Sequence, residues 1–346
     1  MNHSTFKSFT FGIGLFFTLP LVYGNSSSPS SSDGTLYINK SKTHKVAPVK
    51  YGFHYEEIGM MGEGALHAEL IRNRSFEEAT PPAGLSVKNG LYENVPAPRV
   101  KEKKVFQADP LIGWTTYPLS YTPVFISRTD ENPMSGENKY SMLVNVTEDI
   151  ANHPDALILN RGYYGMNLKT DTSYRLSLFL KNRNYSAPLR VFLVDEWGQR
   201  VSNVIEVNVG NRDWTKYTGE LKPEKNVRRG MFAIQPMSKG QFQIDVVSLF
   251  PSDTWNDGKS VFRKDIVQNL KEFSPSFIRF PGGCIVHGVN EETMYHWKKT
   301  LGPIENRPGQ WSKWAPYYRT DGIGYHEFYD CLLYTSPSPR DVEEAR

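Results

Sequence analysis

Apolar residues recur at every second position through the middle of the chain, between about residues 113 and 250. Residues 174–180, YRLSLFL, and residues 205–209, IEVNV, show this alternation clearly. A period of two is typical of strands that bury one face. Turn sequences such as Glu196-Trp197-Gly198 separate the runs, and no helical stretch of useful length interrupts them. We therefore predict an all-β sandwich of about eight strands with a self-contained core.

The pattern differs on either side of this region. Residues 51–76 combine an extended apolar run, a glycine-rich loop and the sequence ALHAELIRNRSF, which predicts one strand, a loop and a short helix. Residues 80–105 are rich in Pro and Gly, so we expect a connection without regular elements. Apolar residues three or four positions apart predict a helix over residues 262–273 that ends before Pro275. Residues 277–280 follow as a strand, so the sequence indicates a β/α unit.

The amino terminus has the features of an export signal. One lysine precedes an apolar run over residues 9–22, and small residues follow it, which predicts a signal peptide over residues 1–24. A membrane anchor is the alternative, but the run is short for a span and contains Pro20. Residues 25–50 begin with a Ser-, Asn-, Pro- and Gly-rich stretch, which predicts a linker that leads into the fold. We expect a secreted or periplasmic protein with no membrane contact after signal removal.

Composition and charge narrow the class of partner. The chain has 346 residues, 39% hydrophobic and 22% charged, which is enough to bury a sizeable core in two domains. Its 40 basic and 37 acidic residues are interspersed and give a formal net charge of +3, so no basic patch indicates nucleic-acid binding. This small net charge fits a neutral binding partner better than a strongly charged one. Cys284 and Cys331 are the only cysteines, so the sequence contains no disulfide framework.

Polar side chains at the carboxyl ends of the predicted strands are the first candidates for a site. In a β/α barrel such residues face the mouth of the active site. Glu56 and Glu57 follow the first strand, and Cys284 follows the second. Adjacent residues of a strand point to opposite faces, so at most one of the two glutamates can face a ligand. A solvated pair of surface carboxylates is the alternative interpretation.

Other candidate chemistry is weak. The spacing of His287, Glu291, Glu292 and His296 fits no compact metal site, so we expect no metal. Cys284 and His287 lack a third, orienting group, which favours a small buried thiol over a nucleophile. The glycine-rich sequences lack the flanking residues of phosphate and dinucleotide loops. We therefore expect no cofactor.

Aromatic residues provide possible platforms for sugar rings. They are dense between residues 297 and 318, where Trp311 and Trp314 are the candidates for stacking on a sugar and core packing is the alternative. In the predicted sandwich, Tyr163 and Tyr164 lie between two glycines. This position is compatible with either a binding platform on a loop or packing.

Three segments of the chain read YGFHYEEIGMMGEGALHAELIRNRSFEE, IRFPGGCIVHG and KKTLGPIENRPGQWSKWAPYYRTDGIGYHEF. Together they resemble the amino-terminal part of an α-L-arabinofuranosidase of glycoside hydrolase family 51. Between the first two, phrases such as GYYGMNL and FQIDVVSLFP resemble a carbohydrate-binding module of the family 4/9 kind. The resemblance covers nearly all of the chain from residue 51 to Asp330. It implies a (β/α)8 barrel whose first two strands, residues 51–56 and 277–280, flank the sandwich in sequence.

The resemblance also implies an activity and two site positions. Family members hydrolyse terminal α-L-arabinofuranosyl groups with retention, using two glutamates roughly 5 Å apart as acid/base and nucleophile. Both lie on later barrel strands, so the resemblance assigns no catalytic residue here. A glutamate at the end of the first strand hydrogen-bonds the sugar ring, and Glu56 matches it. Cys284 stands where better-known members have Asn, and a thiol is a poor hydrogen-bond partner.

The expected organisation is multidomain, an all-β sandwich inserted into an incomplete (β/α)8 TIM barrel. It comprises a signal peptide (1–24), a linker (25–50), the first barrel strand and connection (51–105), the sandwich (106–254), the start of the barrel (255–330) and a tail (331–346). Residues 331–341, CLLYTSPSPRD, resemble a translated sequencing adapter, and a natural divergent tail is the alternative. Residues 255–330 are far fewer than the about 250 of a complete barrel.

The expected substrate is an arabinose-containing polysaccharide or oligosaccharide. Two alternatives stay open at this point. One is a barrel glycosidase that acts on another sugar, which the downstream glutamate-bearing strands would distinguish. The other is a non-catalytic polysaccharide-binding or adhesive module, in which the sandwich is the working part.

The 346-residue chain by itself is predicted to lack hydrolase activity, because neither catalytic glutamate lies in the matched segments. The measurement is release of the aryl group from an aryl α-L-arabinofuranoside. Measurable turnover by this chain would contradict the prediction.

Overall fold

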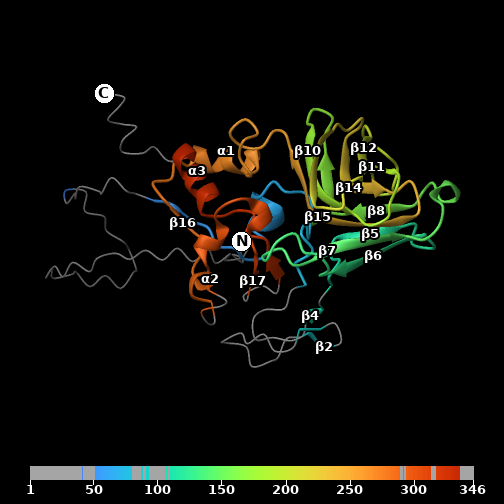
Figure 1. Ribbon diagram of the computed structural model, residues 1–346. Coiled ribbons are helices and arrows are strands. Elements are labelled where there is room, and N and C mark those ends of the chain that lie inside the picture. The colour runs from blue at the N-terminus through green and yellow to red at the C-terminus, as the bar shows by residue number, and fades with distance from the viewer. Residues whose placement is uncertain are drawn as a thin grey trace, which may run out of the picture. The chain divides into compact units, whose positions relative to one another are not determined.

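The computed structural model describes residues 41, 51–79, 87–88, 91–92, 106–107, 109–288, 291, 294–312 and 317–335 (Figure 1). The chain divides into two units, Met1–Pro48 and Val49–Arg346, and the described helices and strands all belong to the second. The predicted signal peptide, the predicted linker apart from Ser41, Trp314 and residues 336–346 lie outside the described residues. No helix in the described part has the length and apolar character of a membrane span.

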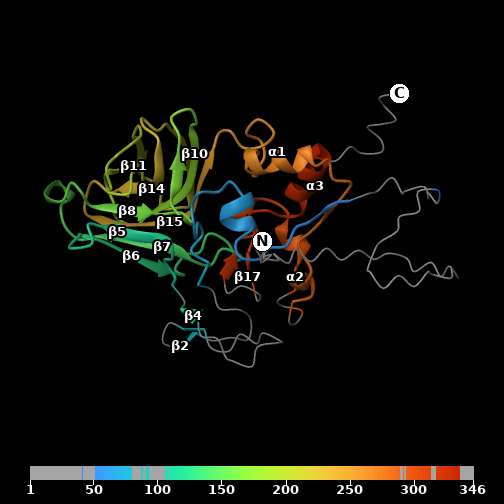
Figure 2. The same cartoon turned by 180° about the vertical axis from the view of Figure 1, so that it is seen from behind.

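Two antiparallel sheets form the middle of the chain (Figures 1 and 2). The strands of the first are β6 (Val124–Thr129), β7 (Ser141–Val146), β10 (Tyr174–Asn182), β13 (Thr215–Leu221) and β15 (Gly240–Pro251). The strands of the second are β5 (Trp114–Tyr117), β8 (Leu157–Asn160), β9 (Met166–Leu168), β11 (Pro188–Val194), β12 (Ile205–Asn208) and β14 (Val227–Gln235). The orders are β13-β10-β15-β7-β6 and β12-β11-β14-β8-β5, with β9 beside β14. A short helical turn, Ile150–Asn152, lies between β7 and β8.

The predicted period of two is confirmed in the long strands. In β10 the buried residues Tyr174, Leu176, Leu178 and Leu180 alternate with more exposed neighbours. The two sheets contain eleven strands in groups of five and six, more than the predicted eight. The shortest, β5, β8, β9 and β12, have only three or four residues. Such segments are too short to show a period of their own.

The core between the sheets also includes residues from outside them. Leu178 of one sheet and Phe232 of the other pack in the same cluster as Ile71 and Phe76, which precede the sandwich in sequence. Phe76 lies 5.5 Å from Trp114 between ring centroids. The prediction of a self-contained sandwich core is therefore wrong, because the segment before the sandwich supplies part of it.

The helix predicted for ALHAELIRNRSF is wrong. After an irregular helical turn, Gly62–Leu66, the backbone is extended and pairs with distant residues. The Ala68 N–H donates to the Val261 carbonyl (2.8 Å), and the Leu70 N–H donates to the Leu249 carbonyl (3.0 Å). These partners lie far away in sequence, and their hydrogen bonds override the local helical propensity.

The predicted connection over residues 80–105 contains regular structure. Strands β2 (Val87–Lys88) and β3 (Leu91–Tyr92) form a three-stranded antiparallel sheet with β4 (Phe106–Gln107). The other residues of the predicted connection lie outside the described part of the chain.

The second part of the fold is formed by the segments directly before and after the sandwich, which pair with each other. Strand β1 (Phe53–His54) pairs in parallel with β16 (Ile278–Arg279), and the pairing places Phe53 opposite Ile278. Helix α1 (Lys264–Glu272) precedes β16, which confirms the predicted helix and strand. The structure therefore contains two neighbouring parallel strands at the positions that the resemblance implies.

The remaining elements follow β16. They are α2 (Cys284–His287), the short helical turns Trp297–Thr300 and Ile304–Asn306, β17 (Gln310–Ser312), β18 (Tyr317–Arg319) and α3 (Tyr325–Thr335). Leu66, Phe262, Val267 and Phe328 form a second core that joins α1, α3 and the helical turn Gly62–Leu66. Helix α3 continues past Asp330, and Cys331 is buried in this core. The origin of residues 331–346 stays a prediction.

The contribution of the preceding segment to the sandwich core can be measured with Phe76→Ala. Because Phe76 is fully buried, the substitution is expected to lower the free energy of unfolding by about 3–5 kcal/mol. Phe125→Ala, at an exposed position of β6, is the control and should change it by less than about 0.5 kcal/mol. Chemical denaturation monitored by near-ultraviolet circular dichroism gives both values. Equal effects of the two substitutions would show that residues 71–76 are not part of the core.

Candidate active site

The carboxyl ends of β1 and β16 meet at one edge, and Glu56 lies there. Its Oε1 accepts a hydrogen bond from the Gly283 N–H at 3.2 Å. The Glu56 side chain makes no other hydrogen bond in the described part of the chain. Its other oxygen, Oε2, therefore has no hydrogen-bond partner among the described residues.

A glycine makes this contact possible. Gly282 has a φ of +142°, and a Cβ atom on it would lie 2.5 Å from Cγ of Glu56. Any other residue would displace the Glu56 side chain from the turn. The Pro281-Gly282-Gly283 turn thus leaves room for the Glu56 side chain, which follows β1, to reach the turn that follows β16.

Cys284 begins α2 directly after this turn, and its side chain is exposed. The interpretation of Cys284 as a buried thiol is therefore wrong. The Nδ1 atom of His287 lies 2.8 Å from the carbonyl oxygen of Gly288 rather than bonding to the thiol. Among the described residues, no group of three His, Cys, Asp or Glu side chains could hold a metal ion.

Glu57 has a different environment from its neighbour. It is 7% exposed, and its Oε1 accepts a hydrogen bond from the Tyr317 hydroxyl at 2.6 Å. Its Oε2 accepts a second from the Tyr55 hydroxyl. Burial, followed by the negative charge of Glu63, raises the pKa of Glu57 above its ordinary value. Both carboxyl oxygens bond to protein donors, so Glu57 holds β1 to β18 rather than facing a ligand.

A third carboxylate, Glu63, was not identified from the sequence. It is buried, and its Oε1 accepts from the N–H and the hydroxyl of Thr320 at 3.0 and 2.7 Å. Its Oε2 accepts from the Tyr163 hydroxyl at 3.3 Å. The only signal in the sequence is an acidic residue between two glycines, and such residues more often lie at the surface.

The charge state of Glu63 is set by these neighbours. Burial alone would raise its pKa, but His67, the Thr320 hydrogen bond and the positive charge of Arg74 together lower it to about 2. The Nδ1 atom of His67 lies 3.8 Å from Oε2, which is an ion-pair separation rather than a hydrogen bond. Glu63 is thus a buried anion that ties the loop after β1 to β18 and to the sandwich.

Two buried arginines form ion pairs that fix β18 and α3. The Nε atom of Arg319 lies 2.7 Å from Oδ1 of Asp321, and the Arg319 guanidinium is 4.9 Å from the centre of the Tyr295 ring. Arg307 pairs with Glu327 of α3 at 2.7 Å. Removing one partner of such a pair leaves an uncompensated buried charge, so these residues hold β18 and α3 in place.

The aromatic candidates have different outcomes. Trp311 lies in β17, where its backbone pairs with Tyr318, but its side chain and all of Trp314 lie outside the described part. Tyr317 and Tyr318 are buried. In the sandwich, Tyr164 is 79% exposed. A role of Trp311 and Trp314 in stacking on a sugar therefore stays a prediction.

Comparison with known proteins shows what the chain is similar to. A family model described as the Alpha-L-arabinofuranosidase 1 domain matches residues 269–336. Alpha-L-arabinofuranosidase 1 of Arabidopsis thaliana is 28% identical over 284 residues, which is 81% of this chain and 38% of that protein. Extracellular exo-alpha-L-arabinofuranosidase of Streptomyces chartreusis is 27% identical over 292 residues, 81% of this chain and 30% of that protein.

The fold has a similar counterpart among solved structures. The arabinose-bound structure of the MgGH51 α-L-arabinofuranosidase has a TM-score of 0.68 and 25% sequence identity. The match covers 86% of this chain and 44% of that chain. The chain thus spans less than half the length of each of these three relatives.

The buried anion can be tested with Glu63→Gln. The folded-state pKa of about 2 lies below the ordinary value of 4.5, so the charge contributes stability that is present above pH 4.5 and is lost as the pH falls toward 2. The substitution should lower the free energy of unfolding by about 3 kcal/mol at pH 7, and by progressively less from pH 4.5 downward. Denaturation of both proteins across this range measures the difference.

Glu137→Gln, at an exposed position, is the matched control for Glu63→Gln and should change stability by less than about 0.5 kcal/mol. A difference between wild type and Glu63→Gln that stays constant from pH 7 to pH 2.5 would contradict the assignment.

Proposed function

We propose that this chain is the amino-terminal part of a retaining α-L-arabinofuranosidase of glycoside hydrolase family 51. The similarity to named α-L-arabinofuranosidases along most of the chain supports this assignment. The substrate is a terminal α-L-arabinofuranosyl group on an arabinose-containing plant polysaccharide or oligosaccharide. The sandwich is a carbohydrate-binding module of the family 4/9 kind, inserted between the first two strands of a (β/α)8 barrel.

The geometry of Glu56 is the observation that carries the proposal. The side chain leaves the carboxyl end of β1 and is held by the Gly283 N–H, with one oxygen open. Glu56 also matches the family's sugar-binding glutamate. A fixed carboxylate at the mouth of a barrel can accept hydrogen bonds from two neighbouring hydroxyl groups of a sugar ring. We therefore assign Glu56 to substrate binding rather than to the bond-breaking step.

The acid/base and nucleophile have to come from elsewhere. Retention needs two carboxyl groups on either side of the glycosidic bond, each with free oxygens. Both oxygens of Glu57 and both oxygens of Glu63 already bond to protein donors. The two catalytic glutamates are therefore assigned to later barrel strands, outside this chain.

The other predicted contacts take secondary roles in this proposal. Cys284 lies beside the Glu56 contact with an exposed thiol, so it borders the sugar without forming a strong hydrogen bond. Trp311 and Trp314 are assigned to the wall of the sugar cleft. The protein acts without a metal or an organic cofactor, because the two glutamates supply both proton transfer and nucleophile.

The place of action is outside the cell or in the periplasm. The predicted signal peptide over residues 1–24 supports export, and the Streptomyces relative is named as an extracellular enzyme. A polymeric substrate requires such a location, since polysaccharides do not cross a membrane unaided.

The role of Glu56 is tested with Glu56→Gln in a protein that also includes the later barrel strands with the two proposed catalytic glutamates. Loss of a charged hydrogen bond to the sugar should lower kcat/KM for an aryl α-L-arabinofuranoside by about 10- to 100-fold. Cys284→Ala should lower it by less than about threefold, because a thiol is a weak partner.

Glu272→Gln, at the exposed end of α1, is the matched control and should leave kcat/KM unchanged. The assignment of Glu56 is wrong if Glu56→Gln behaves like this control. The proposed activity itself is wrong if the wild-type protein with its later barrel strands hydrolyses other glycosides and no α-L-arabinofuranoside.

A further inference from the structure

The sequence contains Asn-X-Ser/Thr triplets, which accept N-linked glycans in proteins that pass through a eukaryotic secretory route. They begin at Asn2, Asn25, Asn39, Asn73, Asn145 and Asn184. The last three triplets lie wholly in the part of the chain that the structure describes. A glycan is bulky and hydrophilic, so a folded protein carries one only where the asparagine amide reaches solvent. The three described side chains differ in this respect.

Asn184 is exposed and lies in the turn between β10 and β11. Its Oδ1 accepts a hydrogen bond from the Gln241 N–H at 2.6 Å. A backbone N–H can only donate, so the atom that faces it is the amide oxygen, and Nδ2 is on the other side of the amide group. Nδ2 is the atom that receives a glycan, and it makes no hydrogen bond in the described part of the chain.

Tyr185 fixes this turn from the inside. It is 3% exposed, its N–H donates to Oδ1 of Asn182 at 2.8 Å, and its hydroxyl accepts from the Met237 N–H at 2.6 Å. Asn184 and Ser186, on either side of it, are both exposed. The two residues that glycan transfer requires therefore stand at the surface on a fixed base.

A glycan at this position leaves the existing contact intact. Transfer forms a bond to Nδ2, and the amide keeps its carbonyl oxygen. Oδ1 of Asn184 can therefore still accept from the Gln241 N–H. The modification does not have to break the hydrogen bond that holds the turn to β15.

Asn73 lacks every one of these properties. It is 1% exposed, its Nδ2 donates to the Pro110 carbonyl at 3.0 Å, and its Oδ1 accepts from the Glu78 N–H at 3.2 Å. An amide enclosed in this way has no room for a glycan. The folded protein therefore excludes modification at Asn73, although the triplet is present in the sequence.

Asn145 is half-buried within β7, between β15 and β6. Its Oδ1 accepts from Nε2 of Gln241 at 3.3 Å. The residues directly opposite it on the two neighbouring strands are Gln241 and Phe125, and directly opposed side chains lie on the same face of a sheet. A glycan at Asn145 would have to displace both of them, which makes this position unfavourable.

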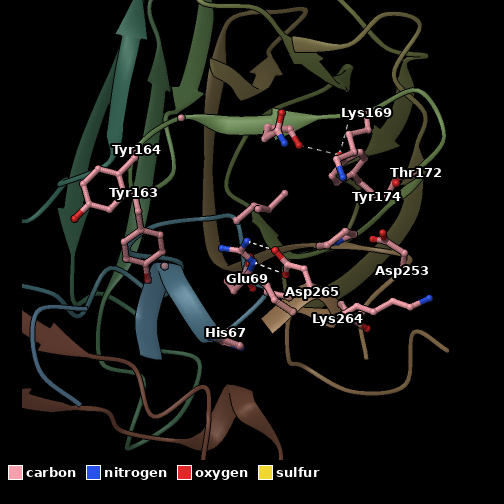
Figure 3. Close-up of a pocket in the computed structure, with 18 residues that line it drawn as sticks. His67, Glu69, Tyr163, Tyr164, Lys169, Thr172, Tyr174, Asp253, Lys264 and Asp265 are labelled. Atoms are coloured by element: carbon pink, nitrogen blue, oxygen red, sulfur yellow. Dashed lines mark hydrogen bonds and ion pairs between the residues drawn. The ribbon is translucent and has the colours of Figure 1, made fainter. Parts of the chain in front are cut away.

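We propose that Asn184 is an N-glycosylation site, modified by transfer of an oligosaccharide from a lipid-linked pyrophosphate donor. The bond between the anomeric carbon and the pyrophosphate oxygen breaks, the bond between that carbon and Nδ2 forms, and one proton leaves Nδ2. The inference rests on the export proposed above and does not depend on the hydrolase activity. Neither Asn184 nor Ser186 lines the pocket between the sandwich and the segment after β1 (Figure 3), so the modified turn is not part of that pocket.

The test is expression of the full 346-residue chain in a eukaryotic host that adds N-glycans. A second version carries the host's own signal peptide in place of residues 1–24. An amidase that removes N-glycans converts each modified asparagine into aspartate, so mass spectrometry of the peptides identifies the modified positions. We expect modification at Asn184 and none at Asn73 or Asn145.

Two variants remove the site in different ways. Ser186→Ala removes the hydroxyl of the triplet and keeps Asn184, whereas Asn184→Asp removes the amide nitrogen and keeps an oxygen that can accept from Gln241. Each should abolish the glycan at residue 184 and leave the melting temperature of the deglycosylated protein unchanged. Ser120→Ala, at an exposed position outside any triplet, is the matched control and should leave the glycan in place.

The two signal peptides separate the possible failures. A glycan at Asn184 only in the version with the host's signal peptide would contradict the proposed export and support the site. The inference is overturned if Asn184 is unmodified in that version, if Asn73 or Asn145 is modified instead, or if the glycan persists in Ser186→Ala.

Discussion

The backbone pairing of residues 66–70 with residues 249–263 is the constraint on which the rest of the structure depends. Leu70 bonds to Leu249, Ala68 to Val261, and Arg263 to Leu66 across this junction. The chain therefore enters and leaves the sandwich side by side. Closing a long loop costs conformational entropy, and here the loop contains the sandwich, whose core includes Ile71 and Phe76 from the segment before it. Strands β1 and β16 can then pair in parallel although a whole sandwich separates them in sequence.

Patterns with a regular local period were predicted well from the sequence. The alternation in β10 and the helical spacing that became α1 depend on which face of each element is buried, and both appear in the sequence. The helix prediction for ALHAELIRNRSF failed because the hydrogen-bond partners of this segment are distant in sequence. Glu69 gives the physical reason for this failure. Its carboxylate accepts hydrogen bonds from the backbone N–H groups of Ile71 and Leu249, and a local helix would not bring Leu249 to this position.

The candidate site shows a similar division. Glu56 and Glu57 both follow the first predicted strand, and only the resemblance to a known family singled out Glu56. Glu57 and Glu63 lie within seven positions of it, and nothing in the sequence separates their roles. Their hydrogen-bond partners distinguish them. Two tyrosine hydroxyls donate to Glu57, whereas Thr320 and Tyr163 donate to Glu63. These partners come from β18 and the sandwich, so only the three-dimensional structure reveals which carboxylate is free.

The exposed thiol of Cys284 has a practical consequence. The only other cysteine, Cys331, is 3% exposed and packed in the second core. A maleimide dye or spin label would therefore attach at one place, directly after the Gly282-Gly283 turn. Such a label would stand next to Gly283, whose N–H bonds to Glu56, without any engineered cysteine. The exposed thiol thus gives the protein a natural attachment point for spectroscopic probes.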